Sequence, residues 1–140
     1  MVARETAAAE IVSLVDDDAG VLTSISRLLT SDGYSVRAFR EPGDFLEHAK
    51  TNPVALVILD IWMEHMTGLE VQAKLARISP STRVIIITGR KDPGAEKTAR
   101  DFGAFAFFLK PFDGDEFLAA VHRALSPPTE PDYRNQERRG

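Results

Sequence analysis

The chain has 140 residues, which suits one domain of about 100–200 residues and is enough to bury a core without disulfides. It contains no cysteine, which excludes disulfides, thiolate metal sites and a cysteine nucleophile. Seventeen basic and 21 acidic residues give a net charge of −4, which argues against direct contact with nucleic acid. The longest apolar run, Val54–Leu59, is far shorter than the ~20 residues of a membrane-spanning helix, and we expect a cytoplasmic protein.

The first part of the chain predicts two β–α units. Ile11–Val15 is a β-branched run that stops at three aspartates, which favours a strand whose carboxyl end lies at Asp16. Apolar residues then recur at three- and four-residue steps up to Gly33, a spacing typical of a helix with a glycine stop. Alternation over Tyr34–Phe39 predicts a second strand, and a proline near the start of Glu41–Lys50 suits the first turn of a helix.

Three further β–α units follow, because apolar runs continue to alternate with helical stripes. They comprise strands over Val54–Leu59, Val84–Ile87 and Ala104–Leu109, and helices through Leu69–Ile78, Lys91–Phe102 and Phe117–Leu125. The first of these strands has no polar residue, which is the mark of a central strand covered on both faces. A dense group of phenylalanines is expected to lie mostly in the core: Phe102, Phe105, Phe107, Phe108 and Phe112.

Five β–α units predict one domain over residues 10–125, with a parallel sheet, right-handed crossovers and helices on both faces. Residues 126–140 hold three prolines and one aromatic residue, too little apolar surface to offset the entropy of ordering. We expect this segment to be a tail or an interdomain linker, and residues 1–9 to be an N-terminal tail.

Polar side chains follow the predicted strands at the point where each strand ends. Asp16 and Asp17 follow the first strand, and Asp60 follows the third. Thr88 ends the fourth strand and Lys110 follows the fifth. Because ligands of an open parallel sheet bind beyond the carboxyl ends of its strands, we expect these five side chains to converge there.

The converging residue types predict a magnesium-dependent phosphate site. Three carboxylates at close range repel and favour a bound cation, and hard oxygen ligands favour Mg²⁺. The ammonium of Lys110 and the hydroxyl of Thr88 suit phosphate oxygens. Asp60 is the natural nucleophile, because a carboxylate can accept a phosphoryl group as an acyl phosphate. Asp18 is expected to cap the following helix rather than to bind metal.

Four motifs in this order resemble the CheY-like receiver domains of two-component response regulators. The motifs are Asp16-Asp17, Leu59-Asp60-Ile61-Trp62-Met63 with Gly68 eight residues past the aspartate, Thr88-Gly89, and Lys110-Pro111-Phe112. The resemblance covers about residues 10–125. It implies a three-layer α/β/α sandwich whose five-stranded parallel sheet has the flavodoxin-like order 2-1-3-4-5.

The resemblance also implies a phosphorylation chemistry. Asp60 would be phosphorylated by a sensor histidine kinase or a phosphotransfer protein. Asp17, Asp60 and the backbone carbonyl of Trp62 would bind Mg²⁺, and Asp16 would assist through water. The chain would then be a signalling domain rather than an enzyme, catalysing only its own phosphoryl transfer and autodephosphorylation.

A conformational switch follows from the same resemblance. Thr88 and Lys110 would contact the phosphoryl oxygens, and the Lys110–Pro111 bond would be cis, a form found almost only before proline. Phe107 matches the aromatic residue that turns inward with Thr88 on activation. The face built from the fourth predicted helix, the fifth strand and the last helix would change shape, and a homodimer through that face is expected.

The sequence departs from the usual pattern of such receivers in one loop. They commonly carry Met-Pro after the phosphorylated aspartate, whereas Met63 is followed here by Glu64, which removes a φ restraint and adds a charge. The residues two beyond the aspartate and two beyond the threonine, which influence acyl-phosphate hydrolysis in the family, are Trp62 and Arg90. We expect the bulky Trp62 to shield the phosphoryl group from water.

Two alternatives stay open on the sequence alone. A haloacid-dehalogenase-type phosphatase would use Asp16 as its nucleophile, but Gly20 stands where that family has threonine or valine, and Asp60 would have no role. Within the receiver interpretation, the chain is either a free-standing signalling protein or the regulatory half of a truncated transcription factor.

Overall fold

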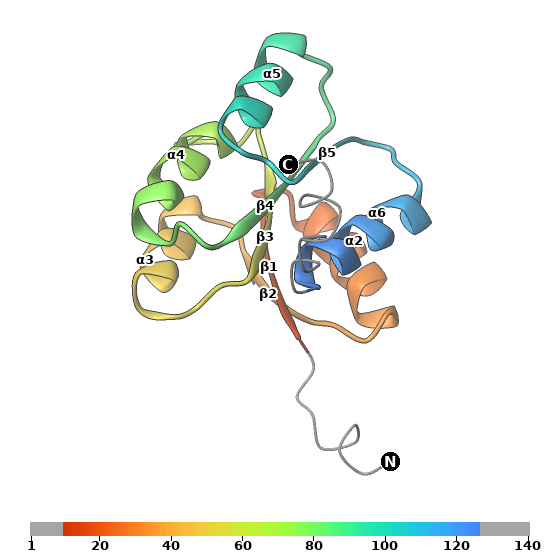
Figure 1. The fold of residues 1–140 in the computed structure, drawn as a ribbon. Coiled ribbons are helices and arrows are strands. Elements are labelled where there is room, and N and C mark those ends of the chain that lie inside the picture. Colours follow the sequence, from red (N-terminus) through yellow and green to blue (C-terminus); the bar gives the residue numbers. More distant parts are fainter. Residues whose placement is uncertain (1–9, 127–140) are drawn as a thin grey trace, which may run out of the picture.

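The computed structural model describes residues 10–126 as five β-strands and five α-helices in strict alternation (Figure 1). The strands are β1 (Ile11–Val15), β2 (Ser35–Phe39), β3 (Leu56–Asp60), β4 (Arg83–Thr88) and β5 (Ala106–Leu109). The helices are α2 (Ala19–Ser31), α3 (Pro42–Thr51), α4 (Gly68–Ile78), α5 (Pro93–Asp101) and α6 (Gly114–Leu125). The expected tail over residues 1–9 and nearly all of the expected linker, residues 127–140, lie outside the described residues.

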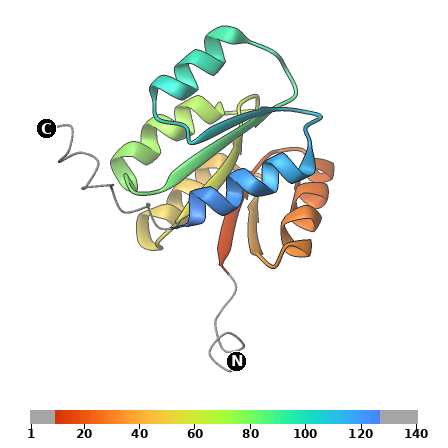
Figure 2. The same cartoon turned by 45° about the vertical axis from the view of Figure 1, so that its right-hand side comes forward.

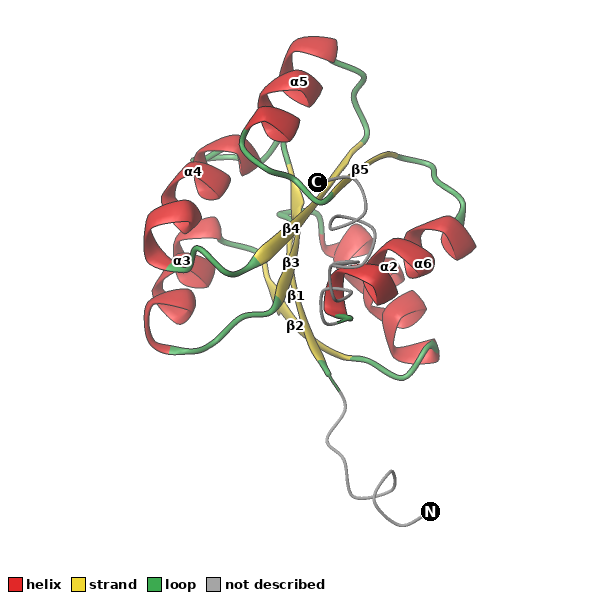
Figure 3. Cartoon of the chain, viewed as in Figure 1, coloured by secondary structure: helices red, strands yellow, loops and turns green. Residues whose placement is uncertain are grey.

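All neighbouring strands pair in parallel, in the order β2-β1-β3-β4-β5, which confirms the predicted topology. Helices α3, α4 and α5 cover one face of the sheet, and α2 and α6 cover the other (Figures 1 and 3). In the turned view, α6 lies along the face opposite to α4 and α5 (Figure 2). The described chain is therefore the three-layer sandwich expected from its β–α repetition. None of its helices between residues 10 and 126 is long and apolar enough to cross a bilayer.

The central strand β3 is buried along its whole length, as its apolar sequence predicts. Its side chains alternate between two cores. Val57 and Leu59 belong to the core beneath α3, α4 and α5, whereas Leu56 and Ile58 belong to the core beneath α2 and α6. This alternation follows from the two-residue period of a strand, and it fixes Asp60 at the end of the most enclosed strand.

Local signals at the helix ends act as predicted. The carboxylate of Asp18 caps α2 by accepting hydrogen bonds from the backbone N–H groups of Gly20 and Val21, at 2.8 and 3.2 Å. Gly33 and Gly103 follow the ends of α2 and α5 with φ values of 95° and 94°, a left-handed conformation that glycine adopts without steric cost.

Several predicted boundaries were wrong by one or two residues. β3 begins at Leu56 rather than at Val54 and includes Asp60, because Val54 is buried without joining the strand ladder. β5 begins at Ala106 rather than at residue 104. Helix α5 begins at Pro93 rather than at residue 91, because the carboxylate of Asp92 accepts a hydrogen bond from an N–H of the first turn.

The prediction that the late phenylalanines lie mostly in the core was only partly right, because three of the five pack against the core clusters: Phe107, Phe108 and Phe112. Phe102 and Phe105 are 53% and 36% exposed, and the other three are only partly buried: Phe107, Phe108 and Phe112. For Phe107 and Phe108, the physical reason is the position of β5 at the edge of the sheet, where a strand has one neighbour and incomplete cover. The guanidinium of Arg83 lies over the exposed ring of Phe105, with the guanidinium carbon 5.1 Å from the ring centroid.

Candidate functional site

Four strand ends meet at one edge of the sheet. In the ladder, Val15 of β1 pairs with Leu59 of β3, so the residues that follow them, Asp16 and Asp60, lie side by side. Asp60 pairs in turn with the residue before Thr88 on β4. Thr88 pairs with Leu109 on β5, and Lys110 comes directly after it. The parallel topology therefore gathers residues that the sequence scatters over almost a hundred positions.

The carboxylates of Asp16, Asp17 and Asp60 form a tight acidic cluster. Each offers one oxygen, and these oxygens all lie within 4.8 Å of one another. Asp16 is fully buried and Asp60 is 6% exposed, whereas Asp17 is half-buried. The predicted convergence of the three carboxylates is confirmed. Their oxygens match in type and spacing what a hard divalent cation requires.

The cluster carries negative charge that the protein itself only partly offsets. Burial, followed by the repulsion of Asp16, raises the pKa of Asp60 to about 6, although the Lys110 ammonium and a backbone hydrogen bond from Trp62 oppose the rise. Burial also raises the pKa of Asp16. Three carboxylates beside one ammonium would be stabilised by a further positive charge. The residues present therefore fit a bound Mg²⁺.

Lys110 brings the positive charge to the cluster. Its Nζ lies 3.5 Å from Asp16 Oδ2 and 4.0 Å from Asp60 Oδ1. The backbone N–H of Lys110 donates to the carbonyl of Thr88 at 2.7 Å, so the chain leaves β5 directly beside the acidic cluster. The peptide bond between Lys110 and Pro111 is cis, as predicted.

Thr88 is fully buried at the end of β4. Its hydroxyl accepts a hydrogen bond from the backbone N–H of Arg90 at 3.2 Å and lies 3.4 Å from the carbonyl of the same residue. The hydroxyl is thus turned toward its own loop in this conformation. Phe107, on the neighbouring strand, packs partly buried against the core on the α3–α5 side.

Steric contact with the backbone of Asp60 and Ile61 requires a glycine at residue 68. A Cβ at this position would overlap the backbone carbonyl oxygen of Asp60 and lie 3.0 Å from the Cα of Ile61. The N–H of Gly68 also donates to the carbonyl of Ile61 at 2.8 Å. The start of α4 therefore lies directly against the backbone that carries Asp60, which only glycine allows.

The loop between β3 and α4 contributes a contact that the sequence did not reveal. The backbone N–H of Glu64 donates to Asp17 Oδ2 at 2.9 Å, while the side chain of Glu64 is 85% exposed. His65, next in the loop, has a φ of 72°. A hydrogen bond from a backbone N–H does not depend on the identity of the side chain, so the sequence cannot predict it from residue type. The sequence signal for this contact was that residue 64 is not proline and therefore has an N–H to donate.

Trp62 and Arg90 stack on each other across the site. The guanidinium carbon of Arg90 lies 4.2 Å from the centroid of the indole, a distance at which cation–π attraction is effective. The indole Nε1 is buried and has no hydrogen-bond partner among the described residues. The pair joins the loop after β3 to the loop after β4.

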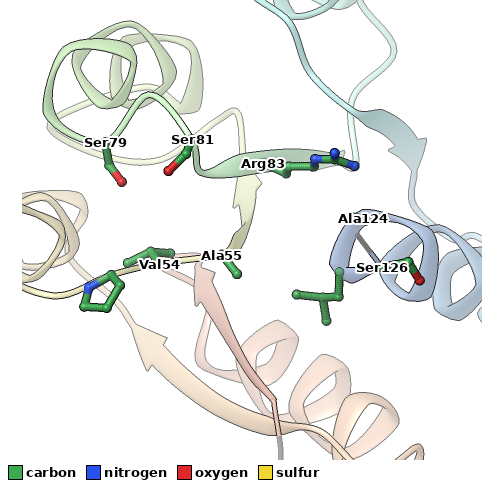
Figure 4. Close-up of a pocket in the computed structure, with 9 residues that line it drawn as sticks. Val54, Ala55, Ser79, Ser81, Arg83, Ala124 and Ser126 are labelled. Carbon is green, nitrogen blue, oxygen red and sulfur yellow. The ribbon is translucent and has the colours of Figure 1, made fainter. Parts of the chain in front are cut away.

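A cavity of about 390 Å³ lies away from this cluster, at the amino ends of the strands (Figure 4). It lies between the segment before β3, the start of β4 and the end of α6, and its lining includes Val54, Arg83 and Ser126. None of its lining residues is acidic. Because ligands of open parallel sheets bind at the carboxyl ends of strands, the acidic cluster is the better candidate site.

Sequence comparison places this geometry in a known family. The profile described as "Response regulator receiver domain" matches residues 12–122, a span that contains all five converging residues. The chain is 36% identical over 117 residues to the response regulator protein TodT of Pseudomonas putida, covering 84% of this chain and 52% of TodT. It is 35% identical over 124 residues to the transcriptional regulatory protein GlrR of Escherichia coli, covering 86% of this chain and 28% of GlrR.

A solved structure supports the same assignment. The CheY-like response regulator receiver domain protein of Methanospirillum hungatei is 25% identical, with a TM-score of 0.78 that covers 94% of this chain and 99% of that one. The phosphatase alternative with Asp16 as nucleophile finds no support in these comparisons. The chain spans about half the length of TodT. By its sequence match and its fold, this chain belongs to the response regulator receiver domain family.

Proposed function

We propose that the chain accepts a phosphoryl group on Asp60 from the phosphohistidine of a sensor histidine kinase or phosphotransfer protein. The observation that carries this proposal is the position of the Asp60 carboxylate, within 4.8 Å of two other carboxylates and 4.0 Å from Lys110 Nζ. An Asp60 oxygen attacks phosphorus, the phosphorus–nitrogen bond breaks, and the imidazole takes up a proton as it leaves. The product is an acyl phosphate, so the chain is a signalling domain that changes state.

Asp17, Asp60 and the backbone carbonyl of Trp62 would hold Mg²⁺, with Asp16 acting through water. When bound, Mg²⁺ offsets the charge of the carboxylates and of the phosphoryl oxygens. The raised pKa of Asp60 supports this part of the proposal, because a cation beside the carboxylate favours the ionised form that acts as the nucleophile.

Lys110 and Thr88 would respond to the phosphoryl group. The ammonium of Lys110, already at the edge of the cluster, pairs with a phosphoryl oxygen. The hydroxyl of Thr88 leaves the backbone of Arg90 and donates to another phosphoryl oxygen. The space that Thr88 vacates admits the ring of Phe107, and the face formed by α5, β5 and α6 changes shape.

This switch is a population shift between two packings. Differential contacts of ~1–3 kcal/mol change partner affinity about 5–150-fold, so a few rearranged side chains are sufficient. Phe102, Phe105 and Leu109 leave apolar surface exposed beside β5, which supports a homodimer through that face after phosphorylation.

Replacing Asp60 with alanine is expected to abolish incorporation of phosphate from acetyl phosphate. Wild type should gain one phosphoryl group only with Mg²⁺ present, as measured by intact mass and by mapping of the labelled peptide. Asp44→Ala is the matched control, because Asp44 is exposed in the first turn of α3 and should leave labelling unchanged. A label on Asp16, or undiminished labelling of Asp60→Ala, contradicts the proposal.

Replacing Trp62 with alanine is expected to accelerate hydrolysis of the acyl phosphate by about tenfold, equivalent to about 1.4 kcal/mol in the barrier. The indole, stacked beneath Arg90, shields the phosphoryl group from water, and Arg90→Ala should give a smaller acceleration. Decay of the phosphorylated species, followed by mass, measures both. Tyr34→Ala, at the opposite end of the sheet before β2, should decay like wild type, and unchanged decay of Trp62→Ala contradicts shielding.

The receiver unit over residues 10–125 is proposed to act in the cytoplasm and to control an output in transcription. The names of its relatives support this output, since GlrR is a transcriptional regulatory protein of which the chain covers 28%. The alternative is that the receiver acts as a free-standing signalling protein. The full-length gene product distinguishes the two, because a regulator of transcription would carry a DNA-binding module in addition to the receiver.

A further inference from the structure

We propose that the backbone N–H of Glu64 is a positioning group of the metal site, which holds the carboxylate of Asp17 and thereby sets the affinity for Mg²⁺. The inference rests on the proposed function, because it assigns a role within the same site. It concerns the main chain of residue 64 and not its side chain, which is 85% exposed.

The three carboxylates of the cluster are held in different ways. Asp60 belongs to β3 and is fixed by the sheet. Asp16 is fully buried, accepts a hydrogen bond from the N–H of Asp18 at 2.9 Å and faces Lys110. Asp17 is only half-buried, and within residues 10–126 its carboxylate accepts a single hydrogen bond, from Glu64 at 2.9 Å. The orientation of the Asp17 carboxylate therefore depends on the loop after β3.

That loop is itself anchored on both sides of residue 64. The N–H of Gly68 donates to the carbonyl of Ile61 at 2.8 Å, and the N–H of Met66 donates to the carbonyl of Glu64 at 2.7 Å. Between them His65 has a φ of 72°, a conformation that a non-glycine residue keeps only when its surroundings impose it.

The far end of the loop is closed by the first turn of α4. Thr67 and Glu70 form a reciprocal capping box, in which each side chain accepts the backbone N–H of the other at 3.1 and 2.8 Å. The N–H of Glu64 therefore belongs to a loop that is hydrogen-bonded to the first turn of α4 at both of its ends.

A fixed donor of this kind acts on metal affinity through the ligand that it orients. Asp17 Oδ2 accepts the N–H of Glu64, and an oxygen of the same carboxylate lies within 4.8 Å of oxygens of Asp16 and Asp60. Removing such an outer partner of a metal ligand typically costs 10–100-fold in affinity. Every residue except proline supplies a backbone N–H. Substitutions at residue 64 can therefore remove the side-chain charge without removing the N–H, which distinguishes the contribution of the N–H to Mg²⁺ affinity from that of the charge.

Glu64→Pro is expected to weaken Mg²⁺ binding about tenfold or more. Glu64→Ala and Glu64→Gln keep the donor and should stay within about twofold of wild type, because an exposed charge is largely screened by water. Binding is measured by calorimetric titration and by the fluorescence of Trp62, the single tryptophan of the chain. Circular dichroism and the metal-free melting temperature establish that the proline variant is folded.

Amide hydrogen exchange tests the hydrogen bond between Glu64 and Asp17 without introducing a proline. The amide proton of Glu64 should exchange slowly in wild type and much faster in Asp17→Ala, because the protecting acceptor is lost. Equal exchange rates in the two proteins, or equal Mg²⁺ affinities of Glu64→Pro and Glu64→Ala, would overturn the inference alone. Failure of wild type to bind Mg²⁺ would overturn the proposed metal site together with it, so the two failures are distinguishable.

Discussion

Replacing Asp60 with asparagine is expected to increase the free energy of unfolding of the metal-free protein at pH 7 by about 3 kcal/mol. Burial and the neighbouring Asp16 raise the pKa of Asp60 from its ordinary value of 3.8 to about 6. Above both values the folded state holds an ionised carboxylate in a place that disfavours it, whereas the unfolded chain ionises Asp60 freely. Asparagine fills the same volume without charge, so the destabilisation is removed.

The stability difference between Asp60→Asn and wild type should depend on pH in one direction. A carboxyl group whose pKa is raised on folding contributes stability below its unfolded pKa and loses that contribution as the pH rises through its folded pKa. The advantage of Asp60→Asn should thus be absent below pH 3.8, grow through the interval from 3.8 to about 6 and be complete above it.

Urea unfolding of wild type and variant at several pH values measures the effect. Asp32→Asn, at the exposed C-cap of α2, is the matched control and should show no comparable gain. Added Mg²⁺ should reduce the difference in free energy of unfolding between Asp60→Asn and wild type, because the ion stabilises wild type more than the variant. A variant that is no more stable than wild type at pH 7 contradicts the assignment of buried charge to Asp60.

Replacing Gly68 with alanine is expected to destabilise the protein by about 3 kcal/mol, because the new methyl group would meet backbone atoms that cannot rotate away. The atoms in its path are the carbonyl group of Asp60 and the Cα of Ile61. Relief requires α4 to move away from β3 or the end of β3 to shift. Either movement displaces the carboxylate of Asp60, so phosphorylation by acetyl phosphate should slow as well.

Gly43→Ala is the control for this substitution. Gly43 lies in the first turn of α3, and a Cβ there would have nothing within 4 Å. Alanine at an unstrained helical position stabilises by about 0.4–1 kcal/mol, so the two glycine variants should change thermal stability in opposite directions. A stable Gly68→Ala with normal phosphorylation would show that the contact between α4 and Asp60 is not tight.

The two predictions concern the same end of β3 but have opposite signs, because the charge of Asp60 lowers the stability of the fold whereas the lack of a side chain at Gly68 preserves it. Asp60 lies at the end of a buried strand, and the start of α4 lies as close to its backbone as a glycine permits.

The sequence by itself determined the layered fold and the gathering of the acidic cluster. β-Branched runs such as Ile11–Val15 pair as strands because their side chains suit a pleated, buried surface. Helical stripes between the runs demand parallel crossovers, which bring all the carboxyl ends to one edge. The convergence of Asp16, Asp17 and Asp60 follows from that topology, and Asp18 caps α2 through a purely local contact.

Only the tertiary structure decided the contacts between loops and the cover of the edge strand. The bond from Glu64 to Asp17 joins a backbone N–H to a side chain 47 residues away, and any residue but proline could donate it. The stack of Arg90 on Trp62 likewise depends on how two loops approach each other. Phe107 and Phe108 of β5 are only partly buried because that strand lies at the edge of the sheet, where burial is decided by missing neighbours rather than by the hydrophobicity of the residue itself.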